Sequence, residues 1–355
     1  EWAGLADAAT WATGNPYGAF FRDWLAEKRG MNRFHGETVL LYFLYTRHIT
    51  AQPKEPPLAM LAGREHSAQA LMRSSWKDDA TAIGFKCTDY YQGHFHHDAG
   101  SFVVYRNGLL AVDAGRYTRY TRSLRAPMIA TSAHNSLLLG GEGQRVVEGQ
   151  WYKDLAEFNK ARADKRDGRR LECGDVPFYK HAGEWTAVAG QFAQAYKPGI
   201  VKSCVRQLLY VRPNTLVVVD NLVPADGKKL PEVRFVLNVP KEKLETGKGF
   251  AVAANEKSWL RCRSLIADAE PIVEDSPATQ LTADYKKKTE IARVNFAYKD
   301  APGALTLVHF IDLGDGKPGA AAEVKPKITA EAVEIGLGGK TFTFSRKAPF
   351  AVEAK

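Results

Sequence analysis

The densest group of chemically active residues lies between Gly93 and Phe102, in the run Gly-His-Phe-His-His-Asp-Ala-Gly-Ser-Phe. Three of the nine histidines of the chain, His94, His96 and His97, fall within four positions of this run. Imidazole nitrogens and carboxylate oxygens are the usual protein ligands of zinc and similar divalent ions. The composition of the run therefore favours a metal site.

The spacing of these residues suggests which of them could meet. If the run is strand-like, alternate side chains point to opposite faces of a sheet, so His94, His96 and Asp98 would share one face. Asp113 follows a predicted hairpin, and His134 lies further along the chain. Since side chains of adjacent strands can converge, we predict a three-ligand metal site of His96, Asp113 and His134. The alternative is that the histidines are ordinary hydrogen-bonded residues of the core or the surface.

A second candidate region lies at positions 116–125, where arginine recurs every third residue and two tyrosines stand between the arginines. Planar guanidinium groups suit carboxylate and sulfate groups, and tyrosine rings suit the faces of sugars. The pattern predicts a segment that binds an acidic substrate through Arg116, Arg119, Arg122 and Arg125. The alternative is a solvated loop whose arginines pair with surface acids.

The first fifty residues have the pattern of helices. Apolar residues recur at helical spacing from Glu1 to Thr13 and from Pro16 to Lys28, and a very apolar segment runs from about Glu37 to His48. A helix this apolar requires burial against other helices, which three short helices do not provide. Residues 1–52 are therefore predicted to be the end of a larger helical domain, and the chain to be a fragment.

After a proline-rich linker at positions 52–57, the pattern changes to short runs rich in β-branched and aromatic residues. Asn107-Gly108 between two such runs is typical of a tight hairpin. No long amphipathic helix separates the runs, which disfavours a parallel α/β sheet, so residues 53–355 are predicted to form a large antiparallel β-sandwich. Examples of its expected strands are Thr81–Cys87, Ser101–Tyr105, Leu109–Val112, Ser136–Leu139, Val205–Val211, Thr215–Val219, Val233–Leu237, Ile291–Phe296 and Leu305–Ile311.

The composition narrows the class of partner. Lys and Arg total 49 against 40 Asp and Glu, a formal charge of +9, which favours a polyanionic partner. No nucleic-acid-binding motif appears, and no apolar run approaches the roughly 20 residues of a membrane span. The four cysteines form no CxxC pattern, and buried free thiols are their expected state.

Residues 72–144 resemble the C-terminal domain of heparinase II/III-type polysaccharide lyases, including oligo-alginate lyases. The resemblance rests on five short sequence motifs that occur in the same order and spacing as in the family. They are RSSW at 73–76, HFHHDAGSF at 94–102, DAG at 113–115, AHN at 133–135 and GEGQ at 141–144. A weaker similarity continues with RQLLYV at 206–211 and VVDN at 218–221. The phrases are specific for the family and not for a substrate.

The resemblance implies an N-terminal (α/α) toroid followed by an antiparallel β-sandwich. Residues 1–52 would be the last helices of the toroid, and residues 53–355 would be the heparinase II/III-like sandwich. It also implies a periplasmic or secreted enzyme that cleaves an acidic, uronic-acid-containing polysaccharide by β-elimination. Most of the toroid is missing from this chain, so the resemblance implies the C-terminal part of such a lyase, incomplete on its own.

Individual residues receive roles from the same resemblance. His96, Asp113 and His134 match the metal ligands of the family, which implies a structural Zn²⁺. His94 matches a histidine that faces the substrate cleft, and Tyr120 matches a cleft tyrosine of oligo-alginate lyases. Elimination from a uronic acid requires groups that remove the C5 proton and protonate the leaving oxygen at C4, which histidine and tyrosine can do.

Two other functions fit part of the pattern. A non-catalytic carbohydrate-binding or structural module would bind glycan without cleaving it. A metal-dependent oxygenase could use His96, Asp98 and His134 as the facial triad that holds iron. The flanking phrases favour the lyase over the oxygenase, and the sequence leaves the choice among alginate, heparan, hyaluronan and other uronates open.

Overall fold

The computed structural model describes residues 2–29, 48–63, 67–89, 95–115, 127–145, 153–163, 171–266, 271–275, 280–281, 288–299 and 301–355. The chain forms two compact units, Glu1–Leu58 and Ala59–Lys355. No helix among the described residues is both long enough and apolar enough to cross a membrane.

The described part of the first unit holds two helices, α1 (Trp2–Thr13) and α2 (Pro16–Arg29), as the sequence predicts. α1 ends at Gly14, whose φ of +65° suits glycine and whose N–H donates to the carbonyl of Thr10 at 2.8 Å. Asn15 begins α2, since its Oδ1 accepts the N–H of Tyr17 at 2.9 Å. Positions 37–47 of the third expected helix lie outside the described residues, and the assignment of these helices to a toroid stays a prediction.

The second unit consists of antiparallel sheets, and every strand pair in its described part is antiparallel, as predicted. Sheet I has the order β1-β2-β3-β4-β5 and sheet II the order β12-β13-β14-β19-β10-β9-β8-β7. Sheet III has the order β15-β18-β11-β6, and sheet IV the order β20-β21-β22-β23. The strands of sheet I are β1 (Ala59–Ala62), β2 (Ser67–Arg73), β3 (Ala82–Thr88), β4 (Ser101–Tyr105) and β5 (Leu109–Ala111).

The remaining elements complete the unit. Sheet II contains β7 (Asp175–Ala182), β8 (Trp185–Gln191), β9 (Val201–Val211), β10 (Thr215–Pro224), β12 (Glu245–Gly247), β13 (Phe250–Ala254), β14 (Ser258–Ser264) and β19 (Leu305–Asp315). Sheet III contains β6 (Leu137–Leu139), β11 (Val233–Pro240), β15 (Ile272–Asp275) and β18 (Ile291–Tyr298). Sheet IV contains β20 (Lys327–Ile328), β21 (Ala332–Leu337), β22 (Lys340–Ser345) and β23 (Val352–Ala354). Outside these sheets lie the pair β16 (Gln280–Leu281) and β17 (Lys288–Thr289), the helix α4 (Leu155–Ala163) and the 3₁₀ turns η2 (Pro127–Ile129), η3 (Thr131–Ala133) and η4 (Ala193–Ala195).

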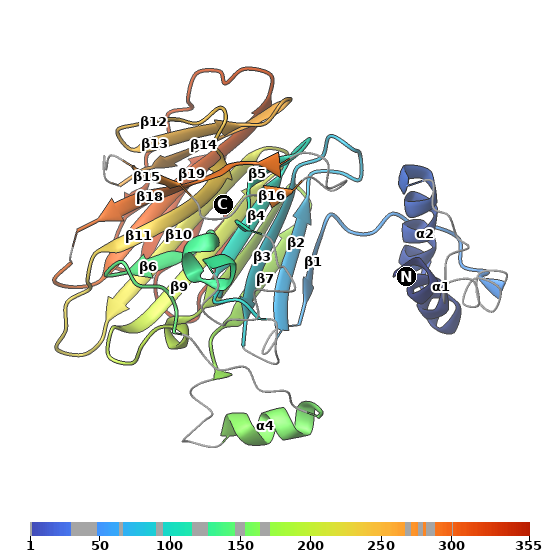
Figure 1. Ribbon diagram of the computed structural model, residues 1–355, viewed down its shortest axis with the longest axis horizontal. Coiled ribbons are helices and arrows are strands. Elements are labelled where there is room, and N and C mark those ends of the chain that lie inside the picture. The colour runs from blue at the N-terminus through green and yellow to red at the C-terminus, as the bar shows by residue number, and fades with distance from the viewer. Residues whose placement is uncertain are drawn as a thin grey trace. The chain divides into compact units, whose positions relative to one another are not determined.

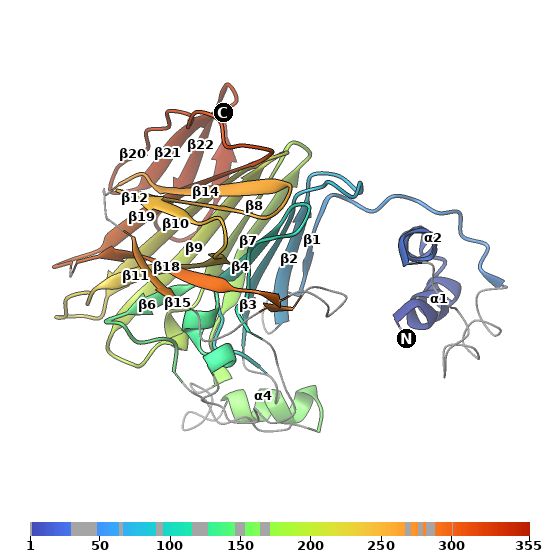
Figure 2. The ribbon, with the colours of Figure 1, turned by 45° about the horizontal axis from the view of Figure 1, so that its top comes forward.

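Sheet II is buried on both faces. On β9 and β10, Leu208 and Val218 face a core shared with sheets I and III, while Leu209 and Val219 face a second core shared with sheet IV. Strands covered on both sides are buried at consecutive positions, which is the pattern of the central parts of β9 and β10. Sheets I and III, then sheet II, then sheet IV therefore form three layers (Figures 1 and 2).

The nine expected strands are confirmed, and several extend beyond the predicted ends. The expected hairpin joins β4 to β5, with Asn107 and Gly108 at φ values of +50° and +146°. All four cysteines are buried and free, as expected.

Candidate metal centre

His96 lies in a loop and not in the expected strand. Residues 95–100 enter β4 through a turn in which the N–H of Ser101 donates to the carbonyl of Asp98 at 3.0 Å. Gly100 has a φ of +73°, and a Cβ there would lie 2.5 Å from the Phe192 ring, so glycine is required. The strand interpretation is wrong for this segment because the left-handed turn at Gly100 ends regular pairing. His96 and Asp98 nevertheless lie close together.

The other two predicted ligands lie on segments bonded to each other. Asp113 follows β5 and His134 follows η3, and the N–H of Ala114 donates to the carbonyl of Ala133 at 2.7 Å. The buried Asn135 fixes both segments, since its Nδ2 donates to the carbonyl oxygens of residues 102 and 112, at 2.7 and 3.2 Å. Its Oδ1 accepts the backbone N–H of residue 238 at 2.7 Å. The backbone around the ligands is therefore tied to three strands, β4, β5 and β11.

His134 contacts both of the other predicted metal ligands, but the set of described ligand atoms that all lie within 4.8 Å of one another comprises His96, Asp98 and His134, without Asp113. Its Nδ1 lies 3.0 Å from Oδ1 of Asp113, and its ring centroid lies 5.1 Å from that of His96. The His134 side chain is fully buried, whereas the Asp113 side chain is half exposed although its Oδ1 is buried. Neither ring nitrogen of His134, nor Oδ1 of Asp113, takes part in a hydrogen bond of regular geometry in the described structure.

This contact has the form expected of two ligands of one ion. Zinc binds histidine nitrogen and carboxylate oxygen at about 2.0–2.2 Å in a tetrahedron, which sets neighbouring ligand atoms about 3.3–3.5 Å apart. The Nδ1–Oδ1 separation of 3.0 Å is slightly shorter than that and falls in the range of an N–H···O hydrogen bond. The distance is therefore compatible with both interactions, and the burial of these polar atoms is what supports a shared cation.

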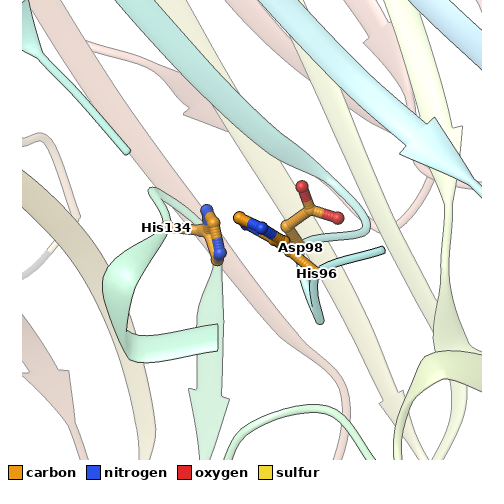
Figure 3. A group of neighbouring side chains, drawn as sticks. All are labelled: His96, Asp98 and His134. Atoms are coloured by element: carbon orange, nitrogen blue, oxygen red, sulfur yellow. The ribbon is translucent and has the colours of Figure 1, made fainter. Parts of the chain in front are cut away.

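Asp98 is a further member of the group that the sequence did not predict as a zinc ligand. One ligand atom each of His96, Asp98 and His134 lies within 4.8 Å of the other two (Figure 3). The His-x-Asp spacing was the signal for it, and it entered only the oxygenase alternative. Lys86 of β3 also borders the group, with its Nζ 2.8 Å from Oδ2 of Asp98.

The protonation of His96 and Asp113 suits metal binding, whereas that of His134 opposes it. Burial, and then the neighbouring His134, lowers the pKa of His96, which keeps its ring neutral and able to ligate at neutral pH. Burial alone would lower the pKa of His134, but the Asp113 carboxylate more than offsets it and raises the pKa, so an ion bound there displaces a proton. Burial acts to raise the pKa of Asp113, and His134 reverses the sign, so this carboxylate is ionised.

The matching sequence motifs at 141–144, 206–211 and 218–221 supply buried residues that support the candidate metal ligands. Arg206 and Asp220 are fully buried and paired, with Nε 2.7 Å from Oδ1 and Nη2 3.1 Å from Oδ2. Nη1 of Arg206 donates to the carbonyl oxygens of Gly100 and Asn135, both at 2.8 Å. Gln144 exchanges two hydrogen bonds with the backbone of Ala99, at 2.7 and 3.0 Å. Residues of these motifs thus fix the loop that contains His96 and the turn that contains His134.

The predicted catalytic and substrate-binding residues are not among those that the structure describes. His94 and Tyr120, and the arginines Arg116, Arg119, Arg122 and Arg125, lie outside the described residues. Their roles stay predictions.

Comparison with known proteins points to one family. A family model described as "Heparinase II/III-like, C-terminal" matches residues 57–302. A solved heparinase III is similar, with 18% identity and a TM-score of 0.61, over 89% of this chain and 44% of that one. The heparan sulfate lyase HepC from Pedobacter heparinus has 16% identity and a TM-score of 0.59, over 92% of this chain and 47% of that one.

A third solved structure extends the likeness to another lyase. The chondroitin AC lyase of Streptomyces coelicolor A3 has 11% identity and a TM-score of 0.51, over 98% of this chain and 47% of that one. At these identities the likeness to the three structures shows the fold. This chain spans less than half the length of each of them. No curated protein matches the sequence.

Proposed function

The chain belongs to the heparinase II/III-like family through its C-terminal domain, and on that premise we propose that it is the C-terminal part of a polysaccharide lyase. The family match confirms the resemblance stated from the sequence. One observation carries the proposal. The matched segment, residues 57–302, includes every residue predicted to bind metal, to bind substrate or to transfer a proton.

The proposed metal is Zn²⁺, held by His96, Asp113 and His134. The support is chemical fit, because nitrogen and carboxylate ligands with buried, unbonded lone pairs are what zinc requires. When bound, the ion would supply a positive charge and a cross-link between the loop before β4, the end of β5 and the turn before β6. Those residues would then keep His94, two positions before His96, in a fixed place. Such indirect positioning is common around metal centres.

The proposed reaction is β-elimination from a uronic acid in an acidic polysaccharide. His94 or Tyr120 would remove the proton at C5, and the other would protonate the oxygen that leaves C4. Arg116, Arg119, Arg122 and Arg125 would bind the acidic groups, and neutralising a carboxylate makes the adjacent C5 proton more acidic. The proposed partner is an N-terminal toroid domain of the same protein, and the proposed location is the periplasm or the exterior of the cell.

A substrate screen tests this function. The chain alone, and a longer form that includes the proposed toroid, would be incubated with alginate, heparan sulfate, hyaluronan and chondroitin sulfate. A lyase produces a conjugated double bond, whose ultraviolet absorbance rises with time. We expect this rise in the longer form with at least one uronate, and its loss in His94→Ala. Binding without cleavage by the longer form would instead favour the non-catalytic carbohydrate-binding module.

A further inference from the structure

An ion pair borders the candidate metal centre. Lys86 of β3 and Asp98 of the loop before β4 face each other, with 2.8 Å between Nζ and Oδ2. The Asp98 side chain is only 6% exposed, whereas that of Lys86 is 31% exposed. A nearly buried carboxylate is costly without a counter-charge, and Lys86 provides one.

The same carboxylate also lies near the two histidines. Ligand atoms of Asp98, His96 and His134 lie within 4.8 Å of one another, although Asp98 bonds to Lys86 (Figure 3). The bond to Lys86 uses Oδ2 and leaves Oδ1 for a second partner. His134 gives an independent sign of a ligand, because its side chain is fully buried and neither ring nitrogen makes a regular hydrogen bond.

We propose that Asp98 is a fourth ligand of the metal ion, and that Lys86 is the cation that compensates Asp98 when the ion is absent. The inference rests on the proposed metal centre. Two histidines and two aspartates would complete the four-coordinate shell of zinc with protein atoms alone, as in structural sites. Lys86 would then hold the loop in its metal-binding form before the ion arrives.

Lys86 also has an opposing effect on the loaded centre. An ammonium group and a divalent cation that share one carboxylate repel each other, and partial burial keeps this repulsion from being fully screened. Lys86 therefore lowers the zinc affinity while it stabilises the metal-free protein. Removing the ammonium group should tighten zinc binding roughly tenfold and destabilise the metal-free form.

Zinc titration of metal-stripped protein tests the proposal. The zinc dissociation constant would be measured by competition with a chromophoric chelator, together with bound zinc per chain and the melting temperature with and without zinc. We expect Lys86→Met to bind roughly tenfold more tightly and to gain more in melting temperature from zinc than the wild type. We expect Asp98→Asn, which keeps the side-chain shape, to bind at least about tenfold more weakly.

The exposed ion pair of Lys202 and Asp226 provides matched controls. Their separation is 2.9 Å and both side chains are more than half exposed, so Lys202→Met and Asp226→Asn should leave the zinc affinity unchanged. The double variant Lys86→Met/Asp98→Asn removes both charges of the ion pair. It provides a second test of Asp98 if a single variant fails to fold. It should bind zinc at least about tenfold more weakly than Lys86→Met, from which it differs only by the loss of the Asp98 carboxylate.

Each contrary result overturns a different statement. If Asp98→Asn binds zinc like the wild type, or the double variant binds it like Lys86→Met, while His134→Ala does not bind, Asp98 is no ligand, and the metal centre stands. If Lys86→Met binds more weakly than the wild type, Lys86 does not compete with the ion. If the wild type binds no zinc, the metal centre itself fails, whatever the substrate screen shows.

Discussion

Two buried charged clusters lie in the same sandwich, and they differ in how many of their polar atoms have hydrogen-bond partners within the protein. In the first, the guanidinium of Arg206 gives two hydrogen bonds to Asp220 and two to backbone carbonyl oxygens, all inside the protein. In the second, His134 is equally buried, yet its nitrogens and Oδ1 of Asp113 lie close together without a regular hydrogen bond. Folding thus pairs the polar groups of the first cluster within the protein, whereas the second keeps buried polar atoms that the proposed zinc ion would bind.

The complete cluster supports the incomplete one. Arg206 donates to the carbonyl of Asn135, the residue after His134, and to that of Gly100, two residues after Asp98. A rigid arginine–carboxylate pair therefore fixes the backbone on both sides of the metal centre. Preorganised ligands lose less entropy when an ion binds, so we expect the first cluster to contribute to the affinity of the proposed zinc centre.

The largest expected effect comes from breaking the complete cluster. Asp220→Asn leaves the buried Arg206 without its counter-charge, which should lower the free energy of unfolding by about 3–5 kcal/mol. Urea denaturation at neutral pH measures it. Asp226→Asn on the exposed pair with Lys202 is the control and should change it by less than about 1 kcal/mol. Equal effects of the two variants would show that the buried pair is not the support inferred above.

The next effect concerns the incomplete cluster. His134→Ala should abolish zinc binding and, with it, the stabilisation that zinc gives, which is about 2.7 kcal/mol when free zinc is a hundred times the dissociation constant. Metal analysis and thermal unfolding with and without zinc measure both quantities. His181→Ala is the control, because His181 of β7 bonds to Thr186 at the edge of sheet II. A His134→Ala protein with one zinc per chain would remove His134 from the ligand set.

Short sequence motifs brought His96, Asp113 and His134 together as predicted metal ligands, but the backbone expected around His96 was wrong. The close approach of the Phe192 ring to Gly100 joins residues ninety-two positions apart, so no local pattern reveals it. The proposal of Asp98 as a ligand came only from the structure, because the loop and not strand alternation brings Asp98 beside His96 and His134.

The hydrophobic signal of each strand explains which strands the sequence analysis named and which it did not. β9 and β10 were visible because each contains a run of adjacent apolar residues, Leu208–Tyr210 and Leu216–Val219, that sheet II buries on both faces. β2 was missed because two of its buried residues are Ala68 and Ala70, which carry little hydrophobic signal. Sheet IV was missed because its short strands bury only alternate residues, such as Val333 and Ile335, against sheet II.

Another fully buried histidine lies away from the candidate metal centre, and it shows that an unbonded ring nitrogen alone does not make a metal site. His309 of β19 is fully buried, stacks on Phe235 with 3.7 Å between ring centroids, and bonds through Nε2 to the hydroxyl of Tyr298. Its Nδ1 has no hydrogen-bond partner, and Arg206 is a charged neighbour. Burial first, and then Arg206, holds the pKa of His309 well below its ordinary value of 6.5.

The sign of the resulting pH dependence follows from linkage. Below pH 6.5 the unfolded chain protonates His309 while the folded chain does not, so stability falls as the pH falls, by up to about 1.4 kcal/mol per pH unit for this one proton. In His309→Phe this contribution is absent, so the loss of unfolding free energy between pH 7 and pH 5 should be smaller by about 1–2 kcal/mol. Urea denaturation of both proteins at the two pH values measures it. Identical pH dependence would mean that His309 is not kept neutral by burial.

The smallest effect concerns an arginine–carboxylate pair at the surface, which tests whether burial or geometry sets the stability of the complete cluster. Arg106 at the β4–β5 turn gives two hydrogen bonds to Asp315 of β19, the same arrangement as Arg206 with Asp220, but the Asp315 side chain is 48% exposed. The bond from Arg106 lowers the pKa of Asp315 to about 2. Because this folded pKa lies below the unfolded one, the pair stabilises above about pH 4 and the contribution disappears as the pH falls toward 2.

Exposure to water should reduce this contribution to about 1 kcal/mol or less, despite the favourable geometry. Asp315→Asn should therefore lower the unfolding free energy by about that amount at pH 7, and the difference from the wild type should narrow as the pH approaches 3. An effect as large as that of Asp220→Asn would mean that the two-bond geometry, and not burial, determines the cost of breaking such a pair. The effect of Asp220→Asn could then no longer be assigned to an unpaired charge inside the sandwich.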